Sequence, residues 1–280
     1  MEILQLINKG SKQLKKNNIK THRLDSEILL AKILKKKREE ILINLNKKVT
    51  AKKIFSFNQL IARRSTKEPI AYILGEKEFW SKNFIVNKNT LIPRPETELM
   101  VEKIVNIFKN KNVHILDIGT GTGCILLSAL SELKNSTGIG IDISKEAIKI
   151  AIKNSTRFNL NHKTKFYRKS ITDFYDYKFD LIVSNPPYIR KKDIKKLDDD
   201  IRKFEPKIAL DGGNDGLDVI KKVIYKSKSI LKNKGMLALE VGNEQFKKVS
   251  KILRNNNFKT SFLIRDYKEN IRCILSTLTI

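Results

Sequence analysis

Residues 116–123 read Leu-Asp-Ile-Gly-Thr-Gly-Thr-Gly; an apolar run from Val113 leads into them, and a helical pattern starts at Cys124. Glycines between a strand and a helix let the backbone turn sharply and approach a ligand closely, while the start of the helix offers unpaired N–H groups. The stretch therefore predicts a ligand-binding loop in a sheet whose strands alternate with helices.

An acid after the next expected strand extends this pattern. Residues 138–141 predict a strand, and Asp142 follows 23 positions after Gly119. In a doubly wound sheet, an acid at that place is within reach of a ribose hydroxyl pair. Strand, loop, helix, strand and acid in this order predict a nucleotide-binding site.

The loop's own letters indicate which nucleotide is bound. Its glycines, Gly119, Gly121 and Gly123, are separated by Thr120 and Thr122. Dinucleotide loops more often read Gly-x-Gly-x-x-Gly. The negative charge of Asp117 would repel a pyrophosphate but would attract the ammonium group of an amino-acid-bearing cofactor. The loop therefore favours S-adenosylmethionine over NAD.

The surrounding chain predicts an α/β fold with a doubly wound, Rossmann-like sheet of seven strands. Strands are expected at 113–118, 138–141, 165–167, 181–184 and 236–241, with a C-terminal antiparallel hairpin at 260–264 and 271–277. Residues 1 to about 65 carry apolar residues at helical spacing and predict a small helical bundle. We expect a helical domain over 1–68, a hairpin connector over 69–95 and the α/β domain over 96–280.

A second motif, Ser184-Asn185-Pro186-Pro187-Tyr188, follows the apolar strand at 181–184. Two prolines stiffen the turn, which lies where open sheets hold their ligands. The Asn185 side-chain oxygen and a neighbouring carbonyl can accept both hydrogens of one planar –NH2 group, and the Tyr188 ring can lie against its face. Such a turn would align a weakly nucleophilic nitrogen with a donated methyl group.

Charge and composition exclude several classes of protein. No apolar run approaches the ~20 residues of a membrane span, and MEILQLINKG shows no secretory signal, so we expect a cytoplasmic protein with no membrane part. The two cysteines, Cys124 and Cys273, exclude a disulfide scaffold, and no metal site is expected. The net charge of +27 fits either an RNA-rich partner such as the ribosome or a compositional bias, since 45 of the 57 basic residues are Lys.

The combined motifs resemble the HemK-type glutamine N5-methyltransferases, which modify peptide chain release factors. The match includes Glu68-Pro-Ile-Ala-Tyr-Ile-Leu-Gly75, the group-specific block Leu91-Ile-Pro-Arg-Pro-Glu-Thr-Glu98, Glu205-Pro206, Asp215-Gly-Leu217, and Glu240 with Gly242. These blocks extend over residues from about 63 to 245. Within the group-specific block, Arg94, Glu96 and Glu98 fit either a lid over the cofactor or a capped helix start.

The resemblance implies transfer of a methyl group from S-adenosylmethionine to the glutamine of the Gly-Gly-Gln loop of release factors, which the helical domain 1–68 would recognise. It implies catalysis by Asn185, Pro186 and Tyr188, and substrate binding by these residues with Pro187. It also implies cofactor binding by Gly119, Thr120, Gly121, Thr122, Gly123, Asp142, Ser170 and Asn185. Ser170 departs from the family, which often has an aromatic residue beside the adenine.

Two other substrates stay open at this level. A ribosomal-protein glutamine presents the same amide. Adenine N6 and guanine N2 present a similar planar nitrogen, which the basic charge favours modestly, although the chain shows no second large recognition domain. A non-catalytic binding module has no use for the Asn-Pro-Pro-Tyr turn.

Overall fold

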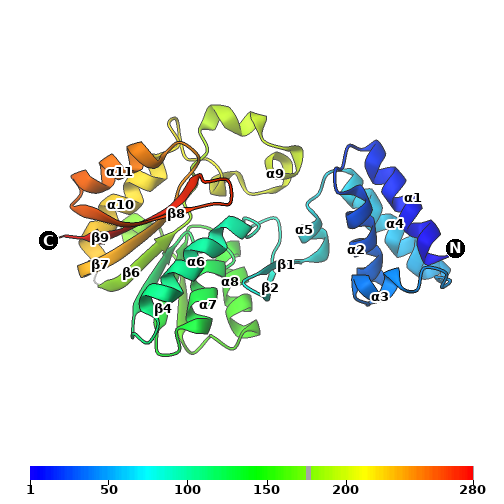
Figure 1. The fold of residues 1–280 in the computed structure, drawn as a ribbon, viewed down its shortest axis with the longest axis horizontal. Helices are drawn as coiled ribbons and strands as arrows, with labels where there is room; N and C mark the ends of the chain where they lie inside the picture. Colours follow the sequence, from blue (N-terminus) through cyan, green and yellow to red (C-terminus); the bar gives the residue numbers. More distant parts are fainter. Residues whose placement is uncertain (175–177, 280) are drawn as a thin grey trace. The chain divides into compact units, whose positions relative to one another are not determined.

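The computed structural model describes residues 1–174 and 178–279, which form two compact units (Figure 1). The first unit consists of residues 1–76 and 198–204, and the second holds the rest. None of the described helices is both long and apolar enough to cross a membrane. The functional division at residues 68 and 95 stays a prediction.

The first unit is helical, as the apolar spacing predicted. Its elements are α1 (Ile3–Lys16), α2 (His22–Leu34), α3 (Arg38–Leu42), α4 (Ala51–Ser65), α5 (Ile70–Leu74) and α9 (Asp199–Phe204). Leu6, Leu30 and Phe57 are fully buried in its own apolar core. A buried ion pair crosses that core, with Arg64 Nε 2.7 Å from Asp25 Oδ2. The first unit therefore has an apolar core and a buried ion pair of its own.

The second unit contains one sheet of seven strands, counted over the residues that are described, in the spatial order β5-β4-β3-β6-β7-β9-β8. The strands are β3 (His114–Ile118), β4 (Thr137–Asp142), β5 (Thr164–Arg168), β6 (Phe179–Ser184), β7 (Leu231–Glu240), β8 (Phe258–Arg265) and β9 (Ile271–Leu278). The five neighbouring strands β5, β4, β3, β6 and β7 run parallel to one another. Strand β9 pairs antiparallel with both β7 and β8. The expected fold class and its C-terminal hairpin are confirmed.

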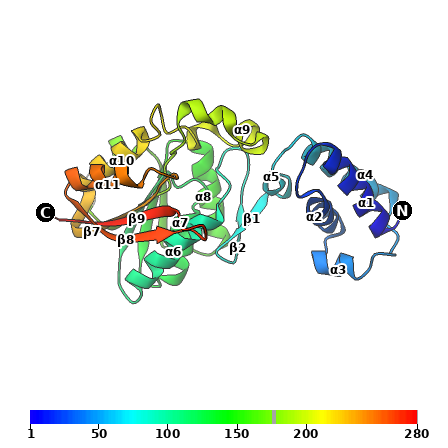
Figure 2. The same ribbon diagram turned by 45° about the horizontal axis from the view of Figure 1, so that its top comes forward.

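Helices and a small hairpin complete this unit. They are β1 (Glu76–Phe79), β2 (Lys82–Ile85), α6 (Pro95–Phe108), α7 (Cys124–Glu132), α8 (Lys145–Arg157), η1 (Ile171–Asp173), η2 (Lys191–Lys196), η3 (Lys207–Ala209), α10 (Asp218–Ile230) and α11 (Phe246–Asn255). Figure 2 shows α10 and α11 on one side of the strands and α6 and α7 on the other. Both faces of the sheet are thus covered, as expected for strands that alternate with helices.

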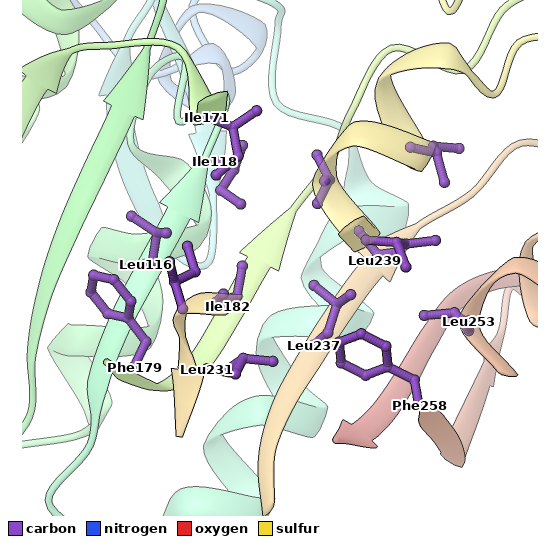
Figure 3. Packing of buried hydrophobic residues seen from close by; sticks show 14 of the residues in the cluster. Leu116, Ile118, Ile171, Phe179, Ile182, Leu231, Leu237, Leu239, Leu253 and Phe258 are labelled. Carbon is purple, nitrogen blue, oxygen red and sulfur yellow. The ribbon is translucent and has the colours of Figure 1, made fainter. Parts of the chain in front are cut away.

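Alternating side chains along the strands supply two apolar cores. Leu116, Ile182 and Leu237 point toward the core that Figure 3 shows, which includes side chains of α10 and α11. Ile115 on β3 and Ala238 on β7 belong to the other core, with α6 and α7. Since strand side chains alternate with a period of two, Asp117 and Glu240 fall on the α6 face. Both acids are buried there, which marks them as exceptional.

Candidate active site at the carboxyl edge of the sheet

A cavity of about 510 Å³ lies where β3, β4 and β6 end. The carboxyl ends of parallel strands meet at one edge, so loops distant in the sequence converge there. Among its lining residues are most of the predicted site residues: Gly119, Thr120, Gly121, Thr122, Asp142, Ser170, Asn185, Pro186 and Pro187. The described lining does not include Gly123 or Tyr188. One pocket therefore brings together the glycine loop and the Asn-Pro-Pro turn.

The glycine loop turns sharply between β3 and α7. Gly119 has φ 72°, and its N–H donates to the Ile141 carbonyl at 2.9 Å, which ties the loop to β4. A Cβ at Gly119 would meet no atom within 4 Å, so the backbone there faces open space. Gly123 caps α7 with φ 80°, where a Cβ would lie 2.9 Å from Leu127. Gly123 therefore fixes the turn from the loop into α7 and is not itself among the described lining residues.

Asp117 is the most perturbed acid beside the loop. Its Oδ2 accepts a hydrogen bond from the Thr120 hydroxyl at 2.7 Å, while Oδ1 is buried without a hydrogen-bond partner among the described residues. Burial raises the pKa of Asp117 to about 7, although the Thr120 bond lowers it and the negative charge of Asp142 adds to the rise. Asp117 is 1% exposed and is not among the described lining of the cavity, whereas the next residue, Ile118, is. The negative charge of Asp117 could therefore attract a cationic group in the cavity, such as the ammonium of S-adenosylmethionine.

Asp142 is held by the backbone on both sides. Its Oδ2 accepts from the Gly121 N–H at 3.0 Å, and its Oδ1 accepts from the Ser144 N–H at 2.9 Å. Burial raises its pKa, and these backbone bonds oppose the rise. A carboxylate offers about four acceptor sites, so beyond its backbone bonds Asp142 can still accept from a hydroxyl of a diol.

Ser170 lies after β5 and lines the cavity beside Ile171. Its hydroxyl oxygen caps η1 by accepting from the Thr172 N–H at 3.3 Å. This part of the lining also includes Ile143, an apolar side chain that is half exposed. Ile143 belongs to no motif, although its place directly after Asp142 was a usable signal in the sequence.

The Asn-Pro-Pro-Tyr turn is anchored at both ends. Before it, the Ser184 hydroxyl donates to the Ile118 carbonyl of β3 at 2.8 Å. At its last residue, the Tyr188 carbonyl accepts a hydrogen bond from Gln245 Nε2 at 3.0 Å. Burial raises the pKa of the Tyr188 phenol to about 12, and the negative charge of Glu240 adds to the rise. The phenol is therefore neutral near pH 7, and its predicted contact with a substrate stays a prediction.

Residues of the other matching blocks support the site from outside the glycine loop and the Asn-Pro-Pro-Tyr turn. Arg94 Nη2 lies 2.7 Å from Glu205 Oε1, and Glu205 Oε2 accepts from the Ile92 N–H at 3.2 Å. Glu98 accepts the Trp80 N–H at 3.0 Å. Arg94 is the N-cap residue of α6, with Pro95 at the first helical position. Glu96 and Glu98 lie in the first turn of this helix, and no described side chain caps its start by a hydrogen bond, so the choice between a lid and a capped helix start stays a prediction.

Two family models match the chain. One is described as the PrmC N-terminal domain and matches residues 5–75, and the other is described as a methyltransferase domain and matches residues 109–272. A release factor glutamine methyltransferase of Buchnera aphidicola subsp. Baizongia pistaciae is 40% identical, over 97% of this chain and 98% of the relative. The chain belongs to the release factor glutamine methyltransferases.

Other relatives differ in length. The release factor glutamine methyltransferase of Fusobacterium nucleatum is 36% identical over 98% of this chain and 78% of its own length. A bifunctional methyltransferase of Rickettsia prowazekii is 37% identical over 97% of this chain, which spans only 56% of that relative. The methyltransferase domain implies S-adenosylmethionine as the methyl donor.

Solved structures support the fold alone. A methyltransferase from Pyrococcus furiosus is similar with a TM-score of 0.54 at 16% identity, covering 71% of this chain and 89% of its own. A ribosomal protein methylase from Lactobacillus delbrueckii subsp. bulgaricus reaches a TM-score of 0.52 at 18% identity, covering 73% and 90%. The α/β methyltransferase architecture of the second unit is thus shared with distant enzymes.

Proposed function

We propose that this methyltransferase modifies the side-chain amide nitrogen, N5, of the glutamine in the Gly-Gly-Gln motif of peptide chain release factors. Family membership supports this substrate. The observation that carries the proposal is the joint placement of the glycine loop and Asn185-Pro186-Pro187 on one cavity. A methyl donor and a planar amide could therefore meet at that edge of the sheet.

In this proposal, S-adenosylmethionine supplies an electrophilic methyl group. Gly119, Thr120, Gly121 and Thr122 bind the cofactor through the loop, and Gly123 keeps the loop in shape. Asp117 attracts the ammonium group, while Asp142 accepts from the ribose hydroxyls. Ser170 lies on the adenine side of the cavity with Ile143 and Ile171 as apolar neighbours.

The Asn185 side-chain oxygen and the Pro186 carbonyl accept the two amide hydrogens of the glutamine, and Pro187 keeps the turn rigid. The Tyr188 ring borders the amide once the substrate is bound. When bound, S-adenosylmethionine would supply the methyl group and would keep the electron pair of its carbon–sulfur bond. Asn185 and Pro186 would hold the amide nitrogen in line with that methyl group, and one amide proton would leave to water. Positioning and electrostatics supply the catalysis, as an amide nitrogen is a weak nucleophile.

The first experiment offers labelled S-adenosylmethionine to the enzyme with a release factor, its Gly-Gly-Gln to Gly-Gly-Ala variant, ribosomal proteins and nucleic acid. Label on the intact release factor but not on the variant is expected. Label confined to a ribosomal protein, DNA or RNA would overturn the proposed substrate. The proposal includes a cytoplasmic location, because release factors act there. It also includes contact with ribosomal RNA through the basic surface.

Two substitutions separate binding from transfer. Asn185→Ala is expected to lower kcat by at least ~100-fold, since it removes an acceptor aimed at the transition state, with little change in cofactor affinity. Asp142→Ala is expected to weaken cofactor binding ~10-fold or more, by loss of charge-assisted bonds. Radiometric kinetics and calorimetry measure the two effects. Near-normal turnover in Asn185→Ala would refute the assigned role.

A further inference from the structure

A buried acid lies directly behind Asn185. Glu240 ends β7, and Ser184 pairs with Leu239 across β6 and β7, so Asn185 and Glu240 follow at the same level of the sheet. Glu240 has no exposed surface; this burial raises its pKa, while hydrogen bonds from the Thr97 and Asn185 side chains lower it. A carboxylate buried to this degree is costly, so its place beside the Asn-Pro-Pro-Tyr turn calls for a role.

Thr97 connects this acid to Asn185. Thr97 lies in the first turn of α6, is 1% exposed and lines the cavity. Its hydroxyl donates to Glu240 Oε2 at 2.6 Å. The Asn185 amide nitrogen Nδ2 lies 3.4 Å from the same hydroxyl oxygen, a weak contact that is longer than the usual N–H···O distance of about 2.7–3.2 Å. Thr97 thus bridges the buried Glu240 and Asn185, and both Thr97 and Asn185 line the cavity.

The chemistry of the three groups sets the direction of these bonds. An ionised carboxylate accepts hydrogen bonds and does not donate, so the Thr97 hydroxyl donates its single hydrogen to Glu240. The hydroxyl oxygen can then only accept, and the group it can accept from is the –NH2 end of Asn185. The oxygen end of the Asn185 amide is thereby turned away from Thr97.

The fold both opposes and supports the charged form of Glu240. Burial raises its pKa above the ordinary value, whereas hydrogen bonds from Thr97 and Asn185 and the nearby Arg272 guanidinium lower it. Four further titratable neighbours among the described residues interact with it. The negative charge of Glu96 raises the pKa of Glu240, and the charge of Glu240 in turn raises the pKa of the Tyr188 phenol and of the Cys124 and Cys273 thiols.

We infer that Thr97 and Glu240 are positioning residues that orient the Asn185 amide, so that its oxygen rather than its nitrogen faces the substrate. The inference rests on the proposed function for the identity of that substrate, an amide –NH2 group. The reversed orientation would set –NH2 against –NH2, two donors without an acceptor between them. Turnover would then fall although the cofactor and the turn remain in place.

The experiment compares Thr97→Val, which keeps the shape but removes the hydroxyl, with Thr97→Ser, which keeps the hydroxyl. Thr164→Val is the matched control, because it also removes a buried hydroxyl. Thr164 lies in β5, and its hydroxyl is hydrogen-bonded to Ser155 Oγ at 2.7 Å. Turnover on release factor is measured for each variant, with cofactor affinity by calorimetry and thermal stability. The side-chain amide signal of Asn185 is followed by NMR in 15N-asparagine-labelled protein and assigned by its loss in Asn185→Asp.

Thr97→Val is expected to lower kcat roughly 10- to 100-fold, with cofactor affinity within about threefold of the wild type. Its Asn185 amide signal should move toward the values of exposed asparagines and exchange faster with water. Thr97→Ser should restore most of the turnover and the signal, and Thr164→Val should lose stability without loss of kcat.

Two results would overturn the inference: an unchanged Asn185 amide signal in Thr97→Val, or an equal loss of kcat in Thr164→Val, which would indicate a general packing effect. If the wild type methylates no release factor, the proposed function fails instead. The NMR comparison then still decides whether Thr97 orients Asn185.

Discussion

Asp117 is buried, and its Oδ1 has no hydrogen-bond partner among the described residues. The local sequence shows only that an acid precedes the glycine loop. The pKa of Asp117 is raised from 3.8 to about 7. Between about pH 4 and pH 7, the folded chain keeps a proton on Asp117 that the unfolded chain has released. Its contribution to the free energy of unfolding therefore decreases as the pH rises through that window.

Asp117→Asn is accordingly expected to gain stability over the wild type by roughly 2–4 kcal/mol at pH 8, with a smaller gain at pH 5. The same substitution should weaken S-adenosylmethionine binding ~10-fold or more, because the ammonium group loses its counter-charge. Urea unfolding at both pH values and calorimetry measure the two effects. A variant that is less stable at pH 8 and binds the cofactor normally would contradict this account.

At the scale of elements, Asn154 joins a helix, a strand and the glycine loop. It is fully buried on α8, and its Oδ1 accepts from the Ile85 N–H of β2 at 2.7 Å. Its Nδ2 donates to the Ile85 carbonyl at 3.1 Å and to the Thr122 carbonyl at 2.9 Å. One side chain thus pairs with β2 as a strand would and fixes the end of the loop.

Asn154→Ala is expected to lower the free energy of unfolding by about 2–4 kcal/mol, because buried backbone groups on two elements lose their partners. Cofactor affinity should fall as well, since the Thr122 carbonyl is released. Asn255→Ala is the matched control: Asn255 is exposed on α11, and its loss should change stability by about 0.5 kcal/mol or less. Equal effects of the two substitutions in denaturant titrations would refute the role of Asn154.

At the scale of the whole molecule, each unit has its own core. The Arg64–Asp25 pair belongs to the first unit, with side chains 9% and 4% exposed. Removing one partner of such a pair leaves an uncompensated buried charge. The cavity, in contrast, is lined by residues 89–223 of the second unit.

Arg64→Met is expected to destabilise the first unit by about 3–5 kcal/mol while cofactor affinity stays within about twofold of the wild type. Arg63→Met is the control, since the Arg63–Glu68 pair is 47% and 18% exposed and should contribute about 1 kcal/mol or less. Scanning calorimetry with and without S-adenosylmethionine measures both. A loss of cofactor binding in Arg64→Met would show that the second unit depends on the first.

Local patterns predicted the framework of this molecule. Apolar periodicity and glycine and proline positions suffice for the seven strands, the helical first unit, the loop at 119–123 and the turn at 185–188, because these features depend on neighbours a few residues apart. Asp142 was predictable too, since a doubly wound sheet sets its distance from the loop.

Tertiary structure alone brought together Thr97 and Glu240, 143 positions apart, and Asn185 and Thr97, 88 positions apart. The same holds for Arg94 with Glu205 and for Asp25 with Arg64. Such pairs follow from strand order, register and helix packing, which a periodic pattern does not encode. The sequence by itself therefore determined the family, the sheet and the motifs of the candidate site, whereas packing decided which buried polar groups stand behind them and how they are oriented.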